Sequence, residues 1–319
     1  MNMTMLNKTK TDILSLAIFV IALAVCSANP SAVFAAIMQE VFATPEQAVD
    51  ALVSATREDK TKDLLKILGP HAGHLIHSGD AVADRMGRGK FVAAYDAAHS
   101  LQDESGGKMI LTVGQEEWPM PIPLVKTDNG WRFDAGAGEQ EILDRRIGRN
   151  ELNVAEVCRA YVEAQREFAN QRFMAGGEHE YAQRLLSTKG KHDGLYWPTS
   201  DSGDKESPLG PLIAQADAEG YPGKAVLNQR APYHGYYYKI LKRQGPGATG
   251  GKMDYMVHGH MIGGFALLAF PARYGDSGVM TFIVNQNGIV YEKNLGVQTT
   301  KLAANITQYD PDESWAIFQ

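Results

Sequence analysis

The chain has 319 residues, of which 44% are apolar and 21% charged, a composition typical of globular proteins rather than disordered or fibrous ones. Its formal net charge is −6, from 31 basic and 37 acidic side chains, which argues against a nucleic-acid-binding protein and against electrostatic binding to a membrane. With two cysteines, Cys26 and Cys158, the sequence excludes a disulfide-stapled scaffold and a zinc site made of several cysteines.

The N-terminus has the pattern of a signal peptide. Lys8 and Lys10 precede a run without charges over residues 13–25 that is apolar apart from Ser15, and small side chains follow. A helix of this length rises only about 20 Å, short of the roughly 30 Å hydrocarbon core of a bilayer. The pattern therefore predicts an exported protein, periplasmic or secreted, that is cleaved after Ala35, with cleavage after Ala28 as the alternative.

Two other fates of this segment stay open, lipidation at Cys26 and an uncleaved anchor. The residue before Cys26 is Val25, which is bulkier than the small residue that a lipoprotein signal has at this position. Cleavage after Ala35 would leave Cys158 as the single thiol. Its helical spacing from Val154, Tyr161 and Val162 predicts a place in the core.

Residues 36–148 are predicted to form a small α+β domain in which helices precede an antiparallel hairpin. Thr44, Pro45 and Gln47 have the spacing of a capped helix start. The sequence Thr127-Asp128-Asn129-Gly130 is a strong hairpin signal. The other predicted elements are helices over 62–68 and 91–100 and strands over 109–113, 121–125 and 131–133.

Residues 149–319 are predicted to form a second α+β domain, with the boundary near Gly148. Ala135-Gly136-Ala137-Gly138 indicates an exit from the first sheet, and a long helix is expected over 152–171. Residues 174–211 are rich in loop formers, with a helix over 210–219 after them. The strands expected in an antiparallel sheet cover 235–244, 265–271, 279–284 and 289–293, and Asn285–Gly288 forms a hairpin turn.

Short phrases in each half resemble known folds. Helices followed by GWRFD (130–134) resemble the cone-shaped domains related to nuclear transport factor 2, which implies a curved sheet around a pocket. GYYYKIL (235–241), GFALLAFP (264–271) and residues 278–296 resemble the globular heads of type IV pilins and pseudopilins. In pilins the helix continues a membrane-inserted apolar stretch. Here a separate predicted domain stands between the two, so a pilus subunit is not expected.

Longer phrases resemble one family over the whole chain from Phe42 onward. They include WPMPIPLV (118–125), GWRFDAGAGEQEILDRRIGRNEL (130–152) and PYHGYYYKILKRQG (232–245). These resemble the exported bacterial proteins grouped as domain of unknown function 2950. The resemblance implies export and a shared architecture, and it implies no activity.

Histidines in two places are weak candidates for a metal site, because imidazole is a common transition-metal ligand. His71, His74 and His77 are spaced by three, although Gly69-Pro70 and Gly73 favour a half-exposed turn there. His258 and His260 would share one face of a strand, although the glycines around them favour a plain hairpin or loop.

Two further groups are candidates for ligand binding. Arg145 and Arg146 could hold a phosphate or carboxylate, or join an ion-pair network with neighbouring acids. Trp197, His234, Tyr236 and Tyr238 form an aromatic-rich set suited to stacking on a sugar or peptide. Alternation along a strand would place Tyr236 and Tyr238 on one face, where packing inside the sheet is the other interpretation.

The sequence contains no convincing phosphate loop, nucleophile elbow or calcium loop, so no catalytic residue and no cofactor are predicted. We expect an exported envelope protein with a non-enzymatic binding or structural role, whose partner is an envelope protein or a glycan and not a nucleic acid. One alternative is a hydrolase with its site in the cone or in the loops around Trp197 and His234. Another is a metal-handling protein that uses the histidine clusters.

Overall fold

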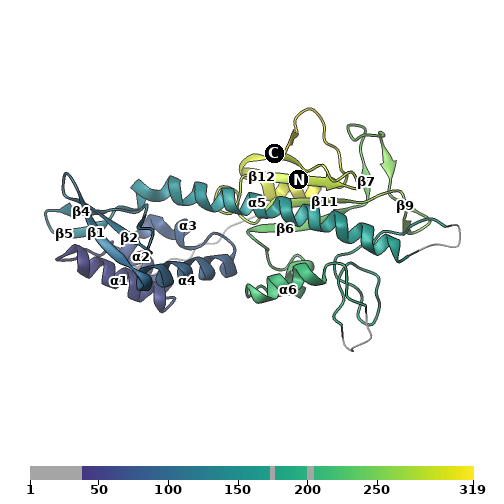
Figure 1. The fold of residues 1–319 in the computed structure, drawn as a ribbon. Helices are drawn as coiled ribbons and strands as arrows, with labels where there is room; N and C mark the ends of the chain where they lie inside the picture. Colours follow the sequence, from purple (N-terminus) through teal and green to yellow (C-terminus); the bar gives the residue numbers. More distant parts are fainter. Residues whose placement is uncertain (1–37, 173–176, 200–204) are drawn as a thin grey trace, which may run out of the picture. The chain divides into compact units, whose positions relative to one another are not determined.

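A computed structural model describes residues 38–172, 177–199 and 205–319. The predicted signal peptide, its cleavage sites and Cys26 lie outside these residues. The described chain has the α+β architecture that the sequence predicts, with a long helix and antiparallel sheets (Figure 1). Within the described ranges, no helix combines the length and the apolar character needed to cross a bilayer.

The first part of the described chain is helical. Its helices are α1 (Pro45–Arg57), α2 (Thr61–Leu68), the short 3-10 helix η1 (Pro70–Ala72), α3 (Gly73–Ile76) and α4 (Ala81–Ala97). Helix α1 begins where predicted, since the Thr44 side chain accepts the backbone N–H of Gln47 at 3.3 Å and Pro45 occupies the first turn. The predicted helix over 62–68 corresponds to α2.

The first sheet follows directly after α4. Its strands are β1 (His99–Glu104), β2 (Lys108–Val113), β3 (Trp118–Pro119), β4 (Leu124–Thr127) and β5 (Gly130–Phe133). They are antiparallel in the order β1-β2-β4-β5, and β3 pairs with β2. The predicted hairpin is confirmed, because Thr127 pairs with Gly130 across the β4–β5 turn.

Three predicted helix boundaries were wrong, the two ends of α4 and the start of α5. Helix α4 begins at Ala81 rather than Phe91, because Asp80 caps it by accepting the backbone N–H groups of Val82 and Ala83. Residues 99–104 then form β1 rather than the end of that helix. Helix α5 (Ala135–Asn170) begins at the glycine-containing segment that was expected to be a loop, and Figure 1 shows it as one uninterrupted helix.

The second sheet is also antiparallel, and its strands are β6 (Tyr236–Leu241), β11 (Ala266–Pro271), β12 (Met280–Asn285), β13 (Tyr291–Asn294) and β14 (Ala316–Ile317). Their order is β14-β13-β12-β11-β6. The connections contain α6 (Gly210–Ala218), α7 (Gly223–Leu227), β7 (Arg243–Gln244), β8 (Met253–Asp254), β9 (Met256–Val257), β10 (His260–Met261), η2 (Gly296–Gln298) and α8 (Thr299–Asn305).

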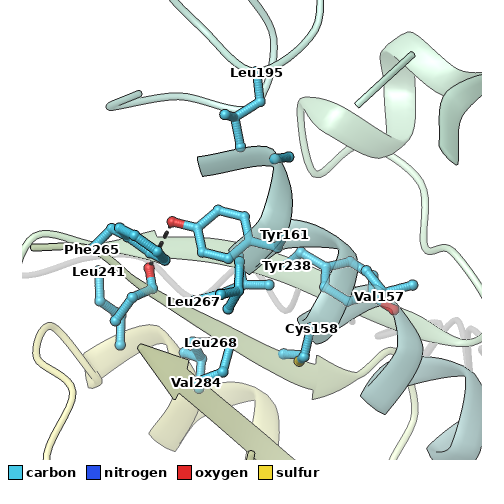
Figure 2. Close-up of a cluster of buried hydrophobic side chains, with 14 of the residues drawn as sticks. Val157, Cys158, Tyr161, Leu195, Tyr238, Leu241, Phe265, Leu267, Leu268 and Val284 are labelled. Carbon is cyan, nitrogen blue, oxygen red and sulfur yellow. Dashed lines mark hydrogen bonds between the residues drawn. The ribbon is translucent and has the colours of Figure 1, made fainter. Parts of the chain in front are cut away.

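The buried apolar side chains form two clusters. One fills the space between α1, α2 and the first sheet, and it includes Leu52, Leu111 and Phe133. The other packs the C-terminal half of α5 against β6, β11 and β12, as Figure 2 shows for Cys158 and Tyr161. The division into domains at Gly148 stays a prediction.

The prediction that Cys158 is a core residue is confirmed. The residue is fully buried, and burial raises the pKa of its thiol to about 12. A thiol that stays protonated is a poor nucleophile. Its neighbour one turn along α5, Tyr161, is also buried and donates its hydroxyl to the carbonyl of Ala266 at 3.2 Å.

Candidate functional site

Two hollows differ in size and lining, and the difference decides which one is the candidate site. The smaller is a cavity of about 30 Å³ between α5, α6, α7 and strands β6 and β11, lined by apolar and aromatic side chains that include Val157, Tyr161 and Tyr233. An engineered apolar cavity that binds benzene measures about 150 Å³. The smaller hollow is therefore a packing defect of the core rather than a ligand site.

The larger hollow is an open cleft of about 510 Å³, within the range of roughly 300–1,000 Å³ found for small-molecule sites. The end of α5 forms one part of it, and segments 177–199 and 205 onward contribute the rest. We refer to it as the Trp197 cleft. Its lining residues are Phe168, Gln171, Arg172, Glu180, His192, Trp197 and Lys205.

Trp197 anchors the aromatic part of this cleft. The side chain is buried, with 6% of its surface exposed, and its indole N–H donates to the carbonyl of Lys205 at 3.0 Å. The imidazole of His192 stacks on the indole, with ring centres 4.4 Å apart and planes 16° from parallel. His192 is exposed, so the outer face of its ring is open to a ligand.

Charged groups surround this stacked pair. The guanidinium of Arg172 lies 4.9 Å above the Phe168 ring and donates to the carbonyl of His192. Glu180 is the carboxylate in the lining, and its Oε1 lies 2.8 Å from Nδ1 of His260. The cleft therefore combines an aromatic floor with cationic and amide donors and with a carboxylate that already has a partner.

Tyr236 and Tyr238 share one face of β6, as the alternation predicted, and that face is the buried one. Tyr236 is fully buried and donates its hydroxyl to the carbonyl of Met280 at 3.0 Å. Tyr238 is 4% exposed and belongs to the same core as Tyr161 and Leu267, as Figure 2 shows. Neither side chain offers a surface on which a ligand could stack.

The two adjacent arginines on α5 have structural partners. Arg145 pairs with Glu141 one turn earlier, at 2.5 Å on an exposed face. Arg146 donates to the carbonyl oxygens of His74 at 2.9 Å and Leu75 at 2.5 Å, and burial lowers the pKa of its guanidinium. Arg146 thus supplies donors to the last carbonyls of α3, which have no partner within that short helix.

His234 lies in a tight turn together with Gly235. Both residues have positive φ, 50° and 78°, and Tyr233 and Tyr236 exchange backbone hydrogen bonds across them. Nε2 of His234 lies 3.3 Å from Oε2 of Glu219, close enough for an ion pair. The geometry is not that of a hydrogen bond, because Oε2 is buried without a donor among the described residues. Burial lowers the pKa of His234 despite the nearby carboxylate.

A buried carboxylate supports this turn from the other side. Asp80 is 1% exposed, and its Oδ2 accepts the hydroxyl of Tyr221 at 2.9 Å and the backbone N–H of Gly235 at 2.8 Å. Its Oδ1 caps α4. Asp80 is therefore fully engaged in holding the start of α4 against the turn, and neither His234 nor Asp80 lines the Trp197 cleft.

The histidine candidates do not converge. Within the described ranges, no three or more His, Cys, Asp or Glu side chains lie close enough together to hold a metal ion. His74 faces Glu139 at 3.1 Å, while His71 and His77 are exposed. His258 and His260 lie in the hairpin that the surrounding glycines favoured, with His258 and Gly259 in the turn between β9 and β10, so the two histidines do not share a strand face.

Sequence reasoning singled out Trp197 but missed the residues around it. Arg172, His192 and Lys205 lie outside regular elements, so no periodicity pointed to them. One signal was present in the sequence. Arg172 follows a long amphipathic helix, and a cation at a helix C-terminus is favourable but is also well placed to meet a ligand.

The fold and the Trp197 cleft together define an α+β protein with an open, polar cleft of ligand-binding size. The chain belongs to the family described as "Protein of unknown function (DUF2950)", whose family model matches residues 39–318. Comparison with curated proteins and with solved structures gave no significant match. The resemblances to pilin heads and to cone-shaped domains stay predictions.

Proposed function

We propose that this chain is an exported protein of the bacterial cell envelope that binds a ligand in the Trp197 cleft and catalyses no reaction there. The observation that carries the proposal is the cleft itself, about 510 Å³ in volume and lined by a stacked His192–Trp197 pair and by several polar groups. Ligand sites combine an apolar or aromatic surface with a few convergent polar groups in this way.

The chemistry of the lining favours binding over catalysis. Among the described residues, the lining includes no serine, threonine or cysteine that could act as a nucleophile. Glu180, which could act as a base, is held at 2.8 Å from His260. A glycan or a peptide segment of an envelope protein fits the cleft, because both present polar groups together with a flat or cyclic body.

Export is supported by the basic, apolar and small-residue order of residues 8–35. In a bacterial host, we expect the protein in the periplasm or medium with Ala36 as its first residue. N-terminal sequencing and intact mass check this. A start at Asn29 would indicate cleavage after Ala28, and a lipid mass on Cys26 would indicate a lipoprotein. A full-length chain confined to the cytoplasm would contradict export.

A ligand screen on the exported protein tests the binding function. Compounds of neutral, cationic and anionic classes are added to ¹⁵N-labelled protein, and the assigned indole N–H signal of Trp197 reports occupancy. Replacing His192 with alanine should weaken binding of a hit about fivefold or more, because it removes the open stacking face. The matched control is His99→Ala, since His99 is also an exposed histidine stacked on an aromatic ring, Tyr95 at 3.7 Å.

The outcome that contradicts the proposal is a screen in which no class of compound moves the Trp197 signal. The hydrolase alternative gains support if a bound compound is cleaved and the His234→Asn variant loses that cleavage. Its structural basis is the proximity of His234 and Glu219, two titratable groups that lie 3.3 Å apart.

A further inference from the structure

We infer that the ligand of the Trp197 cleft carries an anionic group, a carboxylate or a phosphate, which Arg172 and Lys205 hold. The inference rests on the proposed binding function and specifies the chemistry of the ligand. It follows from which charges in the cleft have partners and which do not.

Within the parts of the chain that the structure describes, several arginines of α5 form ion pairs, whereas Arg172, just after the helix, does not. Arg145, Arg159 and Arg166 each pair with a glutamate one turn earlier, Glu141, Glu156 and Glu163, at 2.5, 2.5 and 2.7 Å. Arg172 departs from this pattern. It has no carboxylate within ion-pair distance among the described residues, and Glu167, on the preceding turn, accepts from Gln171 instead.

The guanidinium of Arg172 is nevertheless held in place. The Phe168 ring lies beneath it, and one of its N–H groups donates to the carbonyl of His192. A guanidinium has five N–H donors, so others are left for a ligand. A cation is favourable at the C-terminal end of a helix, which explains an arginine at this position. It does not explain the Phe168 ring beneath the guanidinium or the presence of Lys205 in the same cleft.

The second cation is Lys205. Its backbone is fixed at the cleft, because its carbonyl accepts the indole N–H of Trp197 at 3.0 Å. Lys205 is exposed and belongs to the lining of the cleft, and its ammonium has no carboxylate partner within the described ranges. Two cations in one concave site, neither with a counterion among the described residues, are unfavourable unless an anion or solvent compensates them.

The carboxylate in the lining does not neutralise these cations. One carboxylate cannot balance two cations, and Glu180, whose backbone N–H donates to the carbonyl of Arg172, already has a side-chain partner in His260 at 2.8 Å. The excess positive charge stands out in a chain whose formal net charge is −6. The open face of His192 beside these cations suits an anion borne on a ring.

Three probes that share a pyranose ring and differ in charge test this inference. Glucose is neutral, glucuronate bears a carboxylate and glucose 6-phosphate bears a phosphate. Each probe is titrated into the protein, and the Trp197 indole signal is recorded. At least one of the two anions should bind at least tenfold more tightly than glucose. Added salt should weaken the binding of that anion. Which anion binds more tightly separates a carboxylate from a phosphate ligand.

Variants connect the effect to the two cations. Arg172→Gln and Lys205→Gln should each weaken anion binding about tenfold, because each removes a charge-assisted hydrogen bond. The matched controls are Arg159→Gln on the exposed side of α5 and Lys189→Gln in an exposed turn, neither of which lines the cleft. Glu180→Gln should tighten anion binding, because it removes a negative charge from the lining of the cleft.

Two results would overturn the inference. One is tighter binding of glucose than of both anions, or equal binding of all three. The other is anion binding that both Arg172→Gln and Lys205→Gln leave intact. If neither anion moves the Trp197 signal but a neutral or cationic compound from the screen does, the anion inference fails while the binding function stands. A Trp197 signal that no compound moves counts against both.

Discussion

At the scale of single residues, His234 shows how a local conformation and a titratable group are linked. Its φ of 50° belongs to the left-handed region, which costs a residue with a large side chain about 1 kcal/mol or more. The turn is kept because Asp80 accepts the N–H of Gly235 and Tyr233 pairs with Tyr236. The imidazole is thereby held in a partly buried place beside Glu219.

Replacing His234 with asparagine should flatten the dependence of stability on pH. Burial lowers the pKa of His234 from its ordinary value near 6.5, so the unfolded chain binds the proton more readily than the folded one. Above pH 6.5 His234 is neutral in both the folded and the unfolded chain, and the free energy of unfolding of the parent protein has its full value. As the pH falls from 6.5 toward the lowered pKa, the unfolded chain takes up the proton first and this free energy decreases. The variant lacks this loss. Urea unfolding at pH 8 and pH 5.5 measures it.

At pH 8 the same variant should be as stable as the parent or up to about 1 kcal/mol more stable, because asparagine tolerates positive φ better than histidine. The control is His71→Asn, at an exposed histidine that lies outside the turn. Equal pH slopes for the parent and His234→Asn would refute the role assigned to burial.

At the scale of elements, glycines within helices differ in what surrounds them. A side-chain carbon added at Gly148 of α5 would meet nothing within 4 Å. The same carbon at Gly138, in the first turns of the same helix, would lie 2.4 Å from the carbonyl oxygen of Pro121. Gly138 is therefore required by packing, and Gly148 is not.

Gly148→Ala should stabilise the protein by about 0.5–1 kcal/mol, because alanine loses less backbone entropy in a helix and here has free space. Gly138→Ala should destabilise it by about 1–3 kcal/mol through overpacking. Thermal unfolding of both variants beside the parent measures the difference. A loss of stability for Gly148→Ala would show that the middle of α5 departs from regular helix in solution.

The glycines also explain where prediction of the elements from the sequence failed. Strands β4 and β5 and helix α1 were predicted because turn and cap residues specify them locally. The start of α5 was not, since Ala135–Gly138 has the composition of a loop. In the structure Asp134 caps this helix by accepting the backbone N–H of Ala137, and Gly138 fits closely against Pro121. The early start of α4 depends on Asp80, the residue that caps it. Asp80 was not used as a capping signal in predicting the elements from the sequence.

The candidate site was predictable to a smaller extent than the fold. Trp197 stood out because tryptophan is rare in this chain, which has four. Its cleft is made by tertiary contacts of irregular segments with the end of α5, and no sequence period encodes such contacts. Tyr236 and Tyr238 illustrate the converse, because an aromatic-rich strand is compatible with a binding surface although packing inside the sheet is the commoner outcome.

At the scale of the molecule, the two apolar clusters are connected by helices and by polar contacts. Val82 and Met86 of α4 pack against the cluster of the second sheet, and Phe91 and Tyr95 further along pack against the other. Polar groups reinforce this connection, since Arg273 donates to the carbonyl of His77 at 2.7 Å. Cooperative unfolding of the two clusters depends on such contacts.

Replacing Arg146 should reduce the cooperativity between the unfolding of the two apolar clusters. Its guanidinium donates to the carbonyls of His74 and Leu75, and it lies 3.4 Å from the carbonyl of Asp276 in the second half of the chain. Arg146→Met keeps the aliphatic stem but leaves partly buried carbonyls without this donor. We expect a loss of about 2–3 kcal/mol and a calorimetric transition that broadens or divides in two.

The adjacent Arg145→Met is the matched control, because Arg145 makes an exposed pair with Glu141 on the same helix. Exposed pairs of this kind contribute about 0.3–0.5 kcal/mol, so this variant should unfold in one transition close to that of the parent. Equal losses for the two arginines would mean that Arg146 does not couple the clusters. A divided transition in the parent itself would instead support two independently stable domains that meet near Gly148.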